Sequence, residues 1–424
     1  MTTERVVVIG CGFAGLAAAR QLAGSPVEVA LIDQHNFHTF LPFLYQVATA
    51  GLDPADVAYP VRSIFRRQPN VTFRHGRVTS VDLETRRVTL ADATTIGYDH
   101  LVVGTGAAAG FFGIAGASEY TRPLYTLGDA RRLRNDVLST LEAADARPED
   151  YDGGAPTFVV VGGGATGVET AGALMELLDV AVRQDRLRID PVRTRVILLD
   201  AGDRLLAGFD EALGRYARET LDGRGVIVRL DQAVEEVTAG GVRLVGGEWI
   251  PAAAVVWAGG VTVEGTLAAT LGVARGRGGR VTVESDLSLA GHPEVSVVGD
   301  AAAVPRGPGR PDPCPQLAQV AIQSGRHAGR QILRRKAGRR SEPFHYKDKG
   351  MMATIGRRAA VTQLPGGLVL RGSLGWLAWL GLHIVYLIGF RNRIIVLLNW
   401  WWRYVNWPGG PRLIDADVDV GGSQ

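Results

Sequence analysis

The sequence predicts an α/β protein that contains two copies of one nucleotide-binding unit and a C-terminal amphipathic segment. Several of its 55 glycines stand directly after runs of Val and Ile, where a strand passes into a turn. One strand–glycine–helix pattern occurs twice, and six of the eight tryptophans lie between Trp376 and Trp407. With 424 residues, 46% of them hydrophobic, the chain is long enough for two or three domains with full cores.

Composition argues against several other classes of protein. The net charge is only +3, and no Lys/Arg cluster is interleaved with stacking aromatics, so nucleic-acid binding is not expected. Cys11 and Cys314 form no CxxC or CxxxxC pair, which argues against a disulfide framework or a dithiol redox centre. The N-terminus enters a strand without an export signal, so an intracellular protein is expected. Among the histidines only His35 and His38 have metal-ligand spacing, and we interpret them as loop residues, so no metal is expected.

The first unit is the stretch "RVVVIGCGFAGLAAARQLA", in which an apolar strand runs into Gly10, Gly12 and Gly15 and then into an Ala/Leu-rich helix. This is GxGxxG in the context that Rossmann-like dinucleotide binding requires. The first glycine makes a tight turn, the second lets a pyrophosphate approach the backbone, and the third lets the helix pack on the strand. Asp33 ends the next strand, where its carboxylate can hold a ribose hydroxyl pair. A glycine set that serves only packing is the alternative.

The same unit recurs as "TFVVVGGGATGVETAGALMEL". It places Gly162, Gly164 and Gly167 152 positions after the first glycine set, and Asp200 ends the following strand. We therefore expect two bound nucleotides. Asp200 would repel a 2′-phosphate, which favours NADH over NADPH, although the nearby Arg204 could reverse that choice.

Later apolar strands end in small residues, as "YDHLVVGTGA", "AAAVVWAGG" and "HPEVSVVGDAAA", where large side chains would collide with a nucleotide. In these features the chain resembles the two-dinucleotide-binding flavoprotein reductases. The resemblance implies that Asp300 of the GD dipeptide contacts the FAD ribityl chain and that Thr105 and Gly106 pass close to FAD. It also implies that the first unit binds FAD non-covalently, and that the second binds NADH as a substrate and is inserted into the FAD domain.

The resemblance is sharpest to one family, the type II NADH:quinone oxidoreductases, and covers nearly the whole chain. The segments "HNFHTFLPFLYQVATAGLDP", "GGGATGVETAG" and "AQVAIQSG" carry it; the last is similar to the AQxAxQ quinone-site motif of that family. The first of them has no cysteine, which excludes the disulfide reductase branch and fits sulfide:quinone oxidoreductases badly. The resemblance implies non-proton-pumping respiratory oxidation of NADH, with a hydride passed to FAD and two electrons passed to a membrane quinone, menaquinone or ubiquinone.

Gln319 and Gln323 of "AQVAIQSG" stand at i and i+4, so they share one helical face and present amide groups toward a common point. A quinone needs hydrogen bonds to its carbonyls, and we expect both residues at the quinone site. If the helix begins near the flavin, as in relatives, its N-terminal dipole also stabilises negative charge there. An exposed helix with two solvated glutamines is the alternative.

Three further residues have both a functional and a plain structural interpretation. Glu169 is expected in the first helical turn of the second unit, where the helix dipole favours a carboxylate. By resemblance it matches a glutamate near the nicotinamide and flavin, with a catalytic role in orienting NADH or relaying a proton. Tyr45 and Gln46 are expected at the quinone site, with core packing as the alternative. The stretch "HYKDKGMMATIGRRAAV" predicts an alternating strand pair, and Lys347 and Lys349 within it receive no chemical role.

The tryptophan-rich end, residues 374–407, is expected to attach the protein to a membrane, because a buried core would not need such a concentration of tryptophans. Leu374 to Phe390 is apolar apart from His383, just short of a bilayer span, and "RNR" then interrupts it. Arg391, Arg393 and Arg403, flanked by Trp and Tyr, are expected at lipid headgroups, so a pair of helices lying in one leaflet is the preferred interpretation, with a transmembrane span as the alternative. The expected location is the cytoplasmic face of a bacterial inner membrane. A homodimer is also expected, built in part from the same surface.

These features predict four segments along the chain. Residues 1–120 form the first part of the FAD-binding domain, 121–275 the NADH-binding domain, 276–345 the second FAD-binding part with the quinone-site helix, and 346–424 the strand pair and anchoring helices. Two other functions compete with quinone reduction. One is a soluble flavin reductase with another acceptor, and the other is a redox-sensing flavoprotein that only binds NADH.

Overall fold

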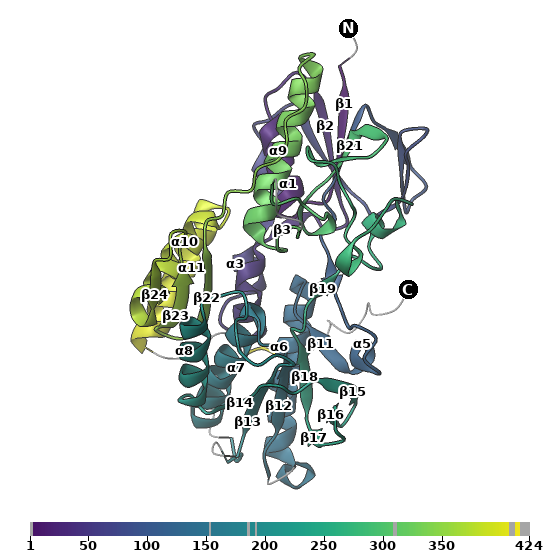
Figure 1. Ribbon diagram of the computed structural model, residues 1–424. Helices are drawn as coiled ribbons and strands as arrows, with labels where there is room; N and C mark the ends of the chain where they lie inside the picture. The colour runs from purple at the N-terminus through teal and green to yellow at the C-terminus, as the bar shows by residue number, and fades with distance from the viewer. Residues whose placement is uncertain are drawn as a thin grey trace. The chain divides into compact units, whose positions relative to one another are not determined.

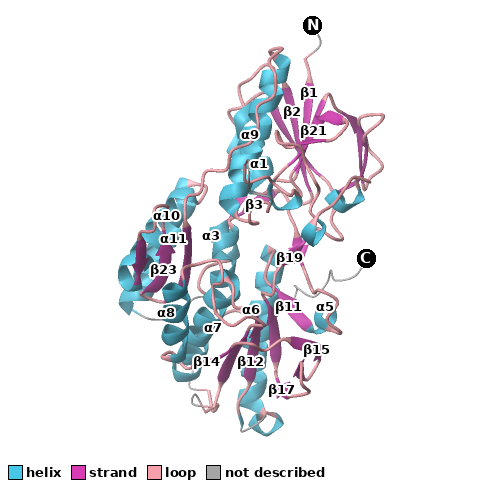
Figure 2. Cartoon of the chain, viewed as in Figure 1, coloured by secondary structure: helices cyan, strands magenta, loops and turns pink. Residues whose placement is uncertain are grey.

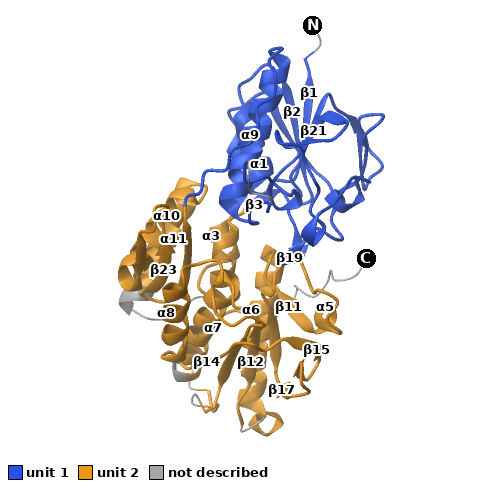
Figure 3. Ribbon diagram, in the orientation of Figure 1, with its two compact units in different colours: residues 1–38, 59–108, 261–349 blue, residues 39–58, 109–260, 350–424 orange. Residues whose placement is uncertain are grey.

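The structure is a computed structural model that describes residues 3–151, 154–184, 187–190, 193–307, 312–406 and 412–415 (Figure 1). The chain forms two compact units (Figure 3). The first contains residues 1–38, 59–108 and 261–349, and the second contains residues 39–58, 109–260 and 350–424.

The first unit is built on a six-stranded sheet in the order β20-β21-β9-β1-β2-β5. Its parallel strands are β1 (Arg5–Ile9), β2 (Glu28–Asp33), β5 (Val71–His75), β9 (His100–Val103) and β21 (His292–Val297), and β20 (Ser288–Leu289) is antiparallel to β21. Val8 of the central strand pairs with Leu31 on one side and Val102 on the other, and all three are fully buried. A continuous apolar run is what a parallel strand covered on both faces requires.

Two helices distant in the sequence lie side by side on this sheet, α1 (Phe13–Leu22) and α9 (Ala318–Lys336) (Figure 2). A glycine makes their close approach possible, because a Cβ at Gly325 would lie 2.0 Å from the carbonyl oxygen of Ala14. The unit also contains α4 (Val61–Phe65) and a three-stranded antiparallel sheet of β6 (Val78–Asp82), β7 (Arg87–Leu90) and β8 (Thr95–Gly97). Short strands stand where the chain passes between units, namely β3 (Phe37–Thr39), β4 (Ala58–Pro60), β10 (Ala108–Ala109) and β19 (Val261–Thr262).

The second unit repeats the parallel architecture in the strand order β11-β18-β12-β13-β14. These strands are β11 (Thr121–Pro123), β12 (Thr157–Val161), β13 (Arg195–Leu199), β14 (Val226–Arg229) and β18 (Ala254–Trp257). Its long helices are α6 (Leu127–Ala146), α7 (Ala165–Gln184) and α8 (Glu211–Asp222). Thr126 and Asp129 form a reciprocal capping box at the start of α6. An antiparallel meander of β15 (Val234–Thr238), β16 (Gly241–Leu244) and β17 (Trp249–Pro251) adds to the core.

The two compact units do not coincide with the four segments predicted from the sequence, which remain a prediction of where FAD and NADH bind. Residues 39–58, 109–120 and 350–424 belong to the second unit, and 261–275 belong to the first. Residues 39–58 supply η1 (Leu41–Phe43), α2 (Leu44–Ala48) and α3 (Pro54–Val57), and α2 packs on α6 and α7; residues 109–120 include α5 (Ala117–Tyr120), which packs on β15. These contacts join segments far apart in the sequence, so composition did not indicate them.

The C-terminal region of the second unit consists of a three-stranded sheet and two helices. They are β22 (Met351–Gly356), β23 (Ala359–Gln363), β24 (Val369–Arg371), α10 (Gly372–Tyr386) and α11 (Phe390–Asn406). The predicted strand pair is confirmed from residue 351 onward as the antiparallel pair β22–β23, whereas residues 345–350 are not in a strand. Strand β22 packs on α7, where a Cβ at Gly172 would lie 2.3 Å from the Ile355 carbonyl oxygen. Within the described ranges, no helix has both the length and the apolar character needed to cross a membrane.

The tryptophan cluster serves two purposes, and the expectation that a core does not need it is wrong for part of it. Trp379 and Trp400 are buried, at 1% and 3% exposure, and pack around Phe43. Trp401 and Trp402 are more than half exposed. A helical stripe of one residue type therefore does not by itself distinguish a core face from an outer face.

Candidate functional site

The loop after β1 has a separate structural reason for each of its three glycines. Gly10 has φ +98°, and a Cβ there would lie 2.3 Å from the carbonyl oxygen of Gly104. A Cβ at Gly15 would lie 1.8 Å from the Gly10 carbonyl oxygen, so α1 could not pack this close to the loop if residue 15 had a side chain. At Gly12, by contrast, no atom of the described residues lies within 4 Å of a built Cβ. That space is where a pyrophosphate would approach the backbone.

The loop after β12 repeats this geometry closely. A Cβ at Gly162 would lie 2.4 Å from the Ala258 carbonyl oxygen, and one at Gly167 would lie 1.7 Å from the Gly162 carbonyl oxygen. No atom of the described part of the chain lies within 4 Å of a Cβ built on Gly164. Two loops far apart in the sequence thus share the same pair of forbidden positions and the same open one, which fits two dinucleotides.

The acidic residues at the two strand ends are also fixed in the same way. Asp33 accepts hydrogen bonds from the backbone N–H groups of Cys11 at 2.5 Å and His35 at 2.7 Å. Asp200 accepts them from Gly163 and, at 2.7 Å, from Gly202. Both carboxylates therefore stand beside their glycine loops, at the edge where a ribose would lie.

Arg204, which could have favoured NADPH, is directed elsewhere. Its guanidinium donates a hydrogen bond at 2.9 Å to the carbonyl oxygen of Ala207 in its own loop. Arg204 is therefore not directed toward Asp200, which follows the last residue of β13.

The remaining predicted FAD residues lie in the same unit as the first loop. Gly299, with φ +69°, begins the short helix η6 (Gly299–Ala301) that contains Asp300, and its N–H donates to the Ser324 hydroxyl at 3.0 Å. A Cβ at Gly299 would lie 2.9 Å from the Ala14 Cβ, so the GD dipeptide packs against α1 and α9. Thr105 and Gly106 follow β9 next to Gly104, which contacts Gly10. Three distant segments thus converge on one cradle.

The two glutamines of "AQVAIQSG" do point toward a common segment, and that segment is backbone. Gln323 donates from its amide to the Lys347 carbonyl oxygen at 2.8 Å and accepts from the Lys347 N–H at 3.0 Å. Gln319 accepts from the Lys349 N–H at 3.0 Å. The interpretation of solvated glutamines on an exposed helix does not describe this geometry.

Sequence reasoning missed two residues that continue this stripe. His327 contacts the Glu342 carbonyl oxygen at 3.1 Å through Nε2, and Gln331 accepts from the Glu342 N–H at 2.9 Å. Together with the two glutamines they follow a spacing of four along α9 and hold residues 342–349, which we call the strap. The signal in the sequence was the spacing of four between the polar residues Gln319, Gln323, His327 and Gln331.

Glu169 lies deeper in α7 than the sequence suggested. The helix begins at Ala165 and has no acidic residue in its first turn, so the helix dipole does not account for Glu169. Its carboxylate accepts a hydrogen bond at 3.1 Å from the Thr354 N–H of β22. Burial raises the pKa of the Glu169 carboxyl to about 8, and this hydrogen bond offsets part of the rise. A carboxyl that is largely protonated at neutral pH can donate a proton as well as accept one.

Tyr45 and Gln46 are buried and belong to a hydrogen-bond network rather than to packing alone. The Thr354 hydroxyl donates to the Tyr45 hydroxyl at 2.9 Å, and the Gln46 amide donates to it at 3.0 Å. The indole N–H of Trp400 donates to the Gln46 amide oxygen at 2.9 Å. A cavity of about 60 Å³ is bordered by these four residues and by Trp376. Thr354 joins this network to Glu169.

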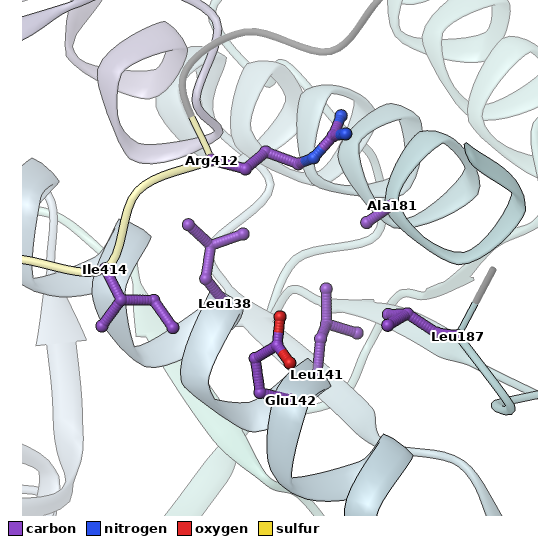
Figure 4. Close-up of a pocket in the computed structure, with 7 residues that line it drawn as sticks. All are labelled: Leu138, Leu141, Glu142, Ala181, Leu187, Arg412 and Ile414. Carbon is purple, nitrogen blue, oxygen red and sulfur yellow. The ribbon is translucent and has the colours of Figure 1, made fainter. Parts of the chain in front are cut away.

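A second cavity, of about 260 Å³, lies away from these residues. Figure 4 shows Arg412 and Ile414, near the C-terminal end, facing Leu138, Leu141 and Glu142 of α6. None of the residues predicted from the sequence borders it. Over the described part of the chain there is also no group of three or more His, Cys, Asp or Glu arranged to hold a metal ion.

Comparisons with known proteins agree with this geometry. Residues 4–325 match the family described as pyridine nucleotide-disulphide oxidoreductase. The type II NADH:quinone oxidoreductase NdhA of Mycobacterium tuberculosis is 42% identical over 413 residues, covering 94% of this chain and 86% of the relative. The Ndh enzyme of the same organism, with the same description, is 39% identical over 412 residues, covering 94% and 87%. The structure of NDH2 from Plasmodium falciparum in complex with NADH has the same fold, with a TM-score of 0.86, 18% identity, and coverage of 97% of this chain and 100% of that one.

Proposed function

The chain belongs to the type II NADH:quinone oxidoreductases, within the pyridine nucleotide-disulphide oxidoreductase family, and on this premise we propose which residues serve each half of the reaction. The enzyme is a flavin-dependent, non-proton-pumping oxidoreductase that converts NADH, a proton and a quinone into NAD+ and a quinol. The observation that carries the assignment of residues is the repeated glycine cradle, with one open position at Gly12 and another at Gly164.

The first unit is proposed to hold FAD without a covalent bond. Bound FAD supplies the redox chemistry, because it accepts a hydride from NADH and delivers two electrons to the quinone. The backbone at Gly12 leaves room for the pyrophosphate of FAD, and the Asp33 carboxylate would accept a hydrogen bond from a ribose hydroxyl. The other residues proposed to contact FAD are Thr105, Gly106 and Asp300. These groups bind and orient the cofactor. No metal is part of the proposal.

The second unit is proposed to bind NADH as a substrate through Gly162, Gly164, Gly167 and Asp200. The Asp200 carboxylate would accept a hydrogen bond from the adenosine ribose and disfavour a 2′-phosphate. Glu169, with its raised pKa, is proposed to hold a proton near the reacting rings and release it during quinone reduction.

The quinone site is proposed to involve Gln319, Gln323, Tyr45 and Gln46. In this structure the two glutamines of α9 bind the strap, so we propose that they act at least in part by positioning its backbone. Tyr45 and Gln46 border the small cavity that includes Trp376 and are proposed to offer polar groups to a quinone carbonyl.

The purified full-length enzyme should show both half-reactions under anaerobic conditions. NADH is expected to bleach the flavin absorbance, and a short-chain quinone is expected to restore it. The Gln319→Ala/Gln323→Ala variant should bleach like the wild type and recover about ten- to a hundredfold more slowly, because a released strap misplaces the acceptor site.

Gln331→Ala is the matched control, since it removes a strap contact at the other end of the same stripe and should recover nearly like the wild type. Equal recovery of the double variant and the wild type would show that the two glutamines have no role in quinone reduction. Bleaching of the wild type without recovery would contradict the quinone assignment itself. Parallel recoveries with menaquinone and ubiquinone analogues would identify the preferred acceptor.

We also propose that α10 and α11 lie in the surface of a membrane, on the cytoplasmic face, as a peripheral attachment. Helix α11 has an outward stripe of large apolar residues, all 40–77% exposed, at Phe390, Ile394, Leu397, Leu398, Trp401 and Trp402. Its inward stripe is buried and includes Asn392, Val396 and Trp400. Outward apolar residues are also present on α10, for example Leu374 and Val385. A helix pair with this polarity suits a lipid interface, and part of the same surface is proposed for a homodimer.

The basic residues near these helices contribute less directly than expected. Arg393 was expected at lipid headgroups, yet its guanidinium donates to the carbonyl oxygens of Leu387 and Val385, both at 2.7 Å. It therefore closes the C-terminal end of α10. Arg391 is exposed and keeps the headgroup role in the proposal, whereas the side chain of Arg403 and all of Trp407 lie outside the described residues.

Replacing Leu398 and Trp401 together with serine should weaken binding to lipid vesicles by about a hundredfold, since two large apolar side chains would no longer enter the acyl boundary. Vesicle cosedimentation measures this effect. Val245→Ser is the control, because Val245 is 67% exposed on the β-meander and should not affect binding. Unchanged binding of the double variant would place the attachment elsewhere, and anaerobic NADH bleaching would confirm that the variant is folded.

A further inference from the structure

The C-terminal end of β14 lies next to Asp200, at the same edge of the parallel sheet. The Asp200 N–H donates to the Arg229 carbonyl oxygen at 3.0 Å, and the Gln232 N–H donates to the Asp200 carbonyl oxygen at 2.9 Å. The Asp231 N–H donates to the Gly202 carbonyl oxygen at 2.9 Å. Arg229, the last residue of β14, therefore stands beside Asp200. In the strand order β14-β13-β12-β18, this is the side toward which adenosine extends when the pyrophosphate rests on the loop after β12.

The guanidinium of Arg229 is occupied by a carboxylate from the meander. Its two terminal nitrogens donate to the two Glu248 carboxylate oxygens at 2.6 and 2.7 Å, and one of them also donates to the Gln232 amide oxygen at 3.1 Å. This is the bidentate geometry that makes arginine a good partner for carboxylate and phosphate alike. The hydrogen bonds from Arg229 lower the pKa of Glu248, so Glu248 remains charged at neutral pH.

Glu248 is held in this position by its turn. It lies in the turn between β16 and β17, where Gly246 and Gly247 have φ of +102° and +92°. The Leu244 N–H donates to the Glu248 carbonyl oxygen at 2.9 Å, and the Val245 N–H donates to the carbonyl oxygen of Ala233 at 2.8 Å. These hydrogen bonds attach the turn to the segment that follows β14 and place the Glu248 carboxylate beside the Arg229 guanidinium.

We propose that Glu248 is a second determinant of selectivity for NADH over NADPH, acting by holding Arg229 away from a 2′-phosphate. A 2′-phosphate needs a guanidinium at this edge, and Arg229 stands there already engaged with another anion. Asp200 repels the phosphate directly, whereas Glu248 removes the cation that would attract it. This inference rests on the proposed binding of NADH in the second unit.

The test compares kcat/KM for NADH and NADPH in a series of variants of the full-length enzyme. Asp200→Asn should raise the NADPH value about tenfold, and adding Glu248→Gln should raise it about tenfold again, because Arg229 is then released toward the phosphate. Adding Arg229→Gln to that pair should cancel the second gain. Glu236→Gln is the matched control, since Glu236 pairs with Arg243 at 2.9 Å in the same meander and its loss should change neither value.

Two outcomes would overturn the proposal. One is an unchanged NADPH value when Glu248→Gln is added to Asp200→Asn, and the other is a gain that persists after Arg229→Gln. Failure of the underlying function would appear differently, because the wild-type enzyme itself would then not be bleached by NADH. Circular dichroism of each variant separates misfolding from a change in selectivity.

Discussion

Replacing Gly12 with alanine should give a folded protein without flavin, and replacing Gly164 with alanine should give a flavin-loaded protein with an NADH KM about a hundredfold higher. Both substitutions add a methyl group where no atom of the described residues lies within 4 Å, so the protein alone can accommodate it. Gly12 has φ −65° and ψ −171°, which alanine adopts readily. The cost therefore falls on the nucleotide that must approach the backbone.

The ratio of flavin to protein absorbance after purification measures the first effect, and steady-state kinetics measure the second. Gly15→Ala is the contrasting variant, because its methyl group would lie 1.8 Å from the Gly10 carbonyl oxygen and should destabilise the fold itself. Normal flavin content in Gly12→Ala, together with loss of flavin in Gly164→Ala, would exchange the two nucleotide assignments. Normal behaviour of both variants would contradict dinucleotide binding at these loops.

Glu169→Gln should remove a pH dependence from the quinone half-reaction and slow it about a hundredfold, within the usual range for loss of general acid catalysis. The wild-type carboxyl, with a pKa of about 8, is protonated below that pH. Flavin reoxidation by quinone should therefore slow as the pH rises through about 8 in the wild type, whereas the glutamine variant should be slow and nearly pH-independent. Stopped-flow reoxidation between pH 6 and 9.5 makes the comparison.

The same residue predicts a stability effect with a definite sign. Because the folded-state pKa lies above the ordinary value of 4.5, the carboxyl favours folding most below that value, and this contribution is lost as the pH rises toward about 8. Glu169→Gln should therefore gain stability relative to the wild type over that range, and the gain should level off above it. Denaturant unfolding at several pH values measures it. If neither the stability difference between the two proteins nor the wild-type rate of flavin reoxidation changed with pH, Glu169 would not titrate near pH 8.

The two glycine cradles could be predicted from the sequence because their physics is local. A strand, three glycines and a helix within a short stretch determine the turn, the open position and the packing contact. The position of Asp200 follows for the same reason, since it ends the next strand. The partner of Gln323 could not be predicted, because the strap reaches α9 only after the chain reverses direction.

Long-range packing accounts for the other differences from expectation. Nothing near residues 39–58 in the sequence indicates that α2 packs on α6 and α7, so the place of this segment in the second compact unit could not be predicted. Trp400 and Trp401 are adjacent in the sequence and have opposite exposures, because Trp400 packs on Phe43 and Trp401 points outward. Glu169 was placed one turn too early, since glycine spacing marks where the loop is but not where helical hydrogen bonding begins.

Helix α11 differs from an ordinary surface helix, because its polar Asn392 is buried while large apolar side chains such as Phe390 and Trp401 face outward. Asn392 donates to the carbonyl oxygens of Ala55, Asp56 and Ala58, so the inner face cannot rotate outward without losing these bonds. The helix consequently cannot bury its exposed apolar face by rotating about its axis. In plain buffer this enzyme should be colloidally unstable, and a mild detergent should be needed from cell lysis onward to keep it dispersed.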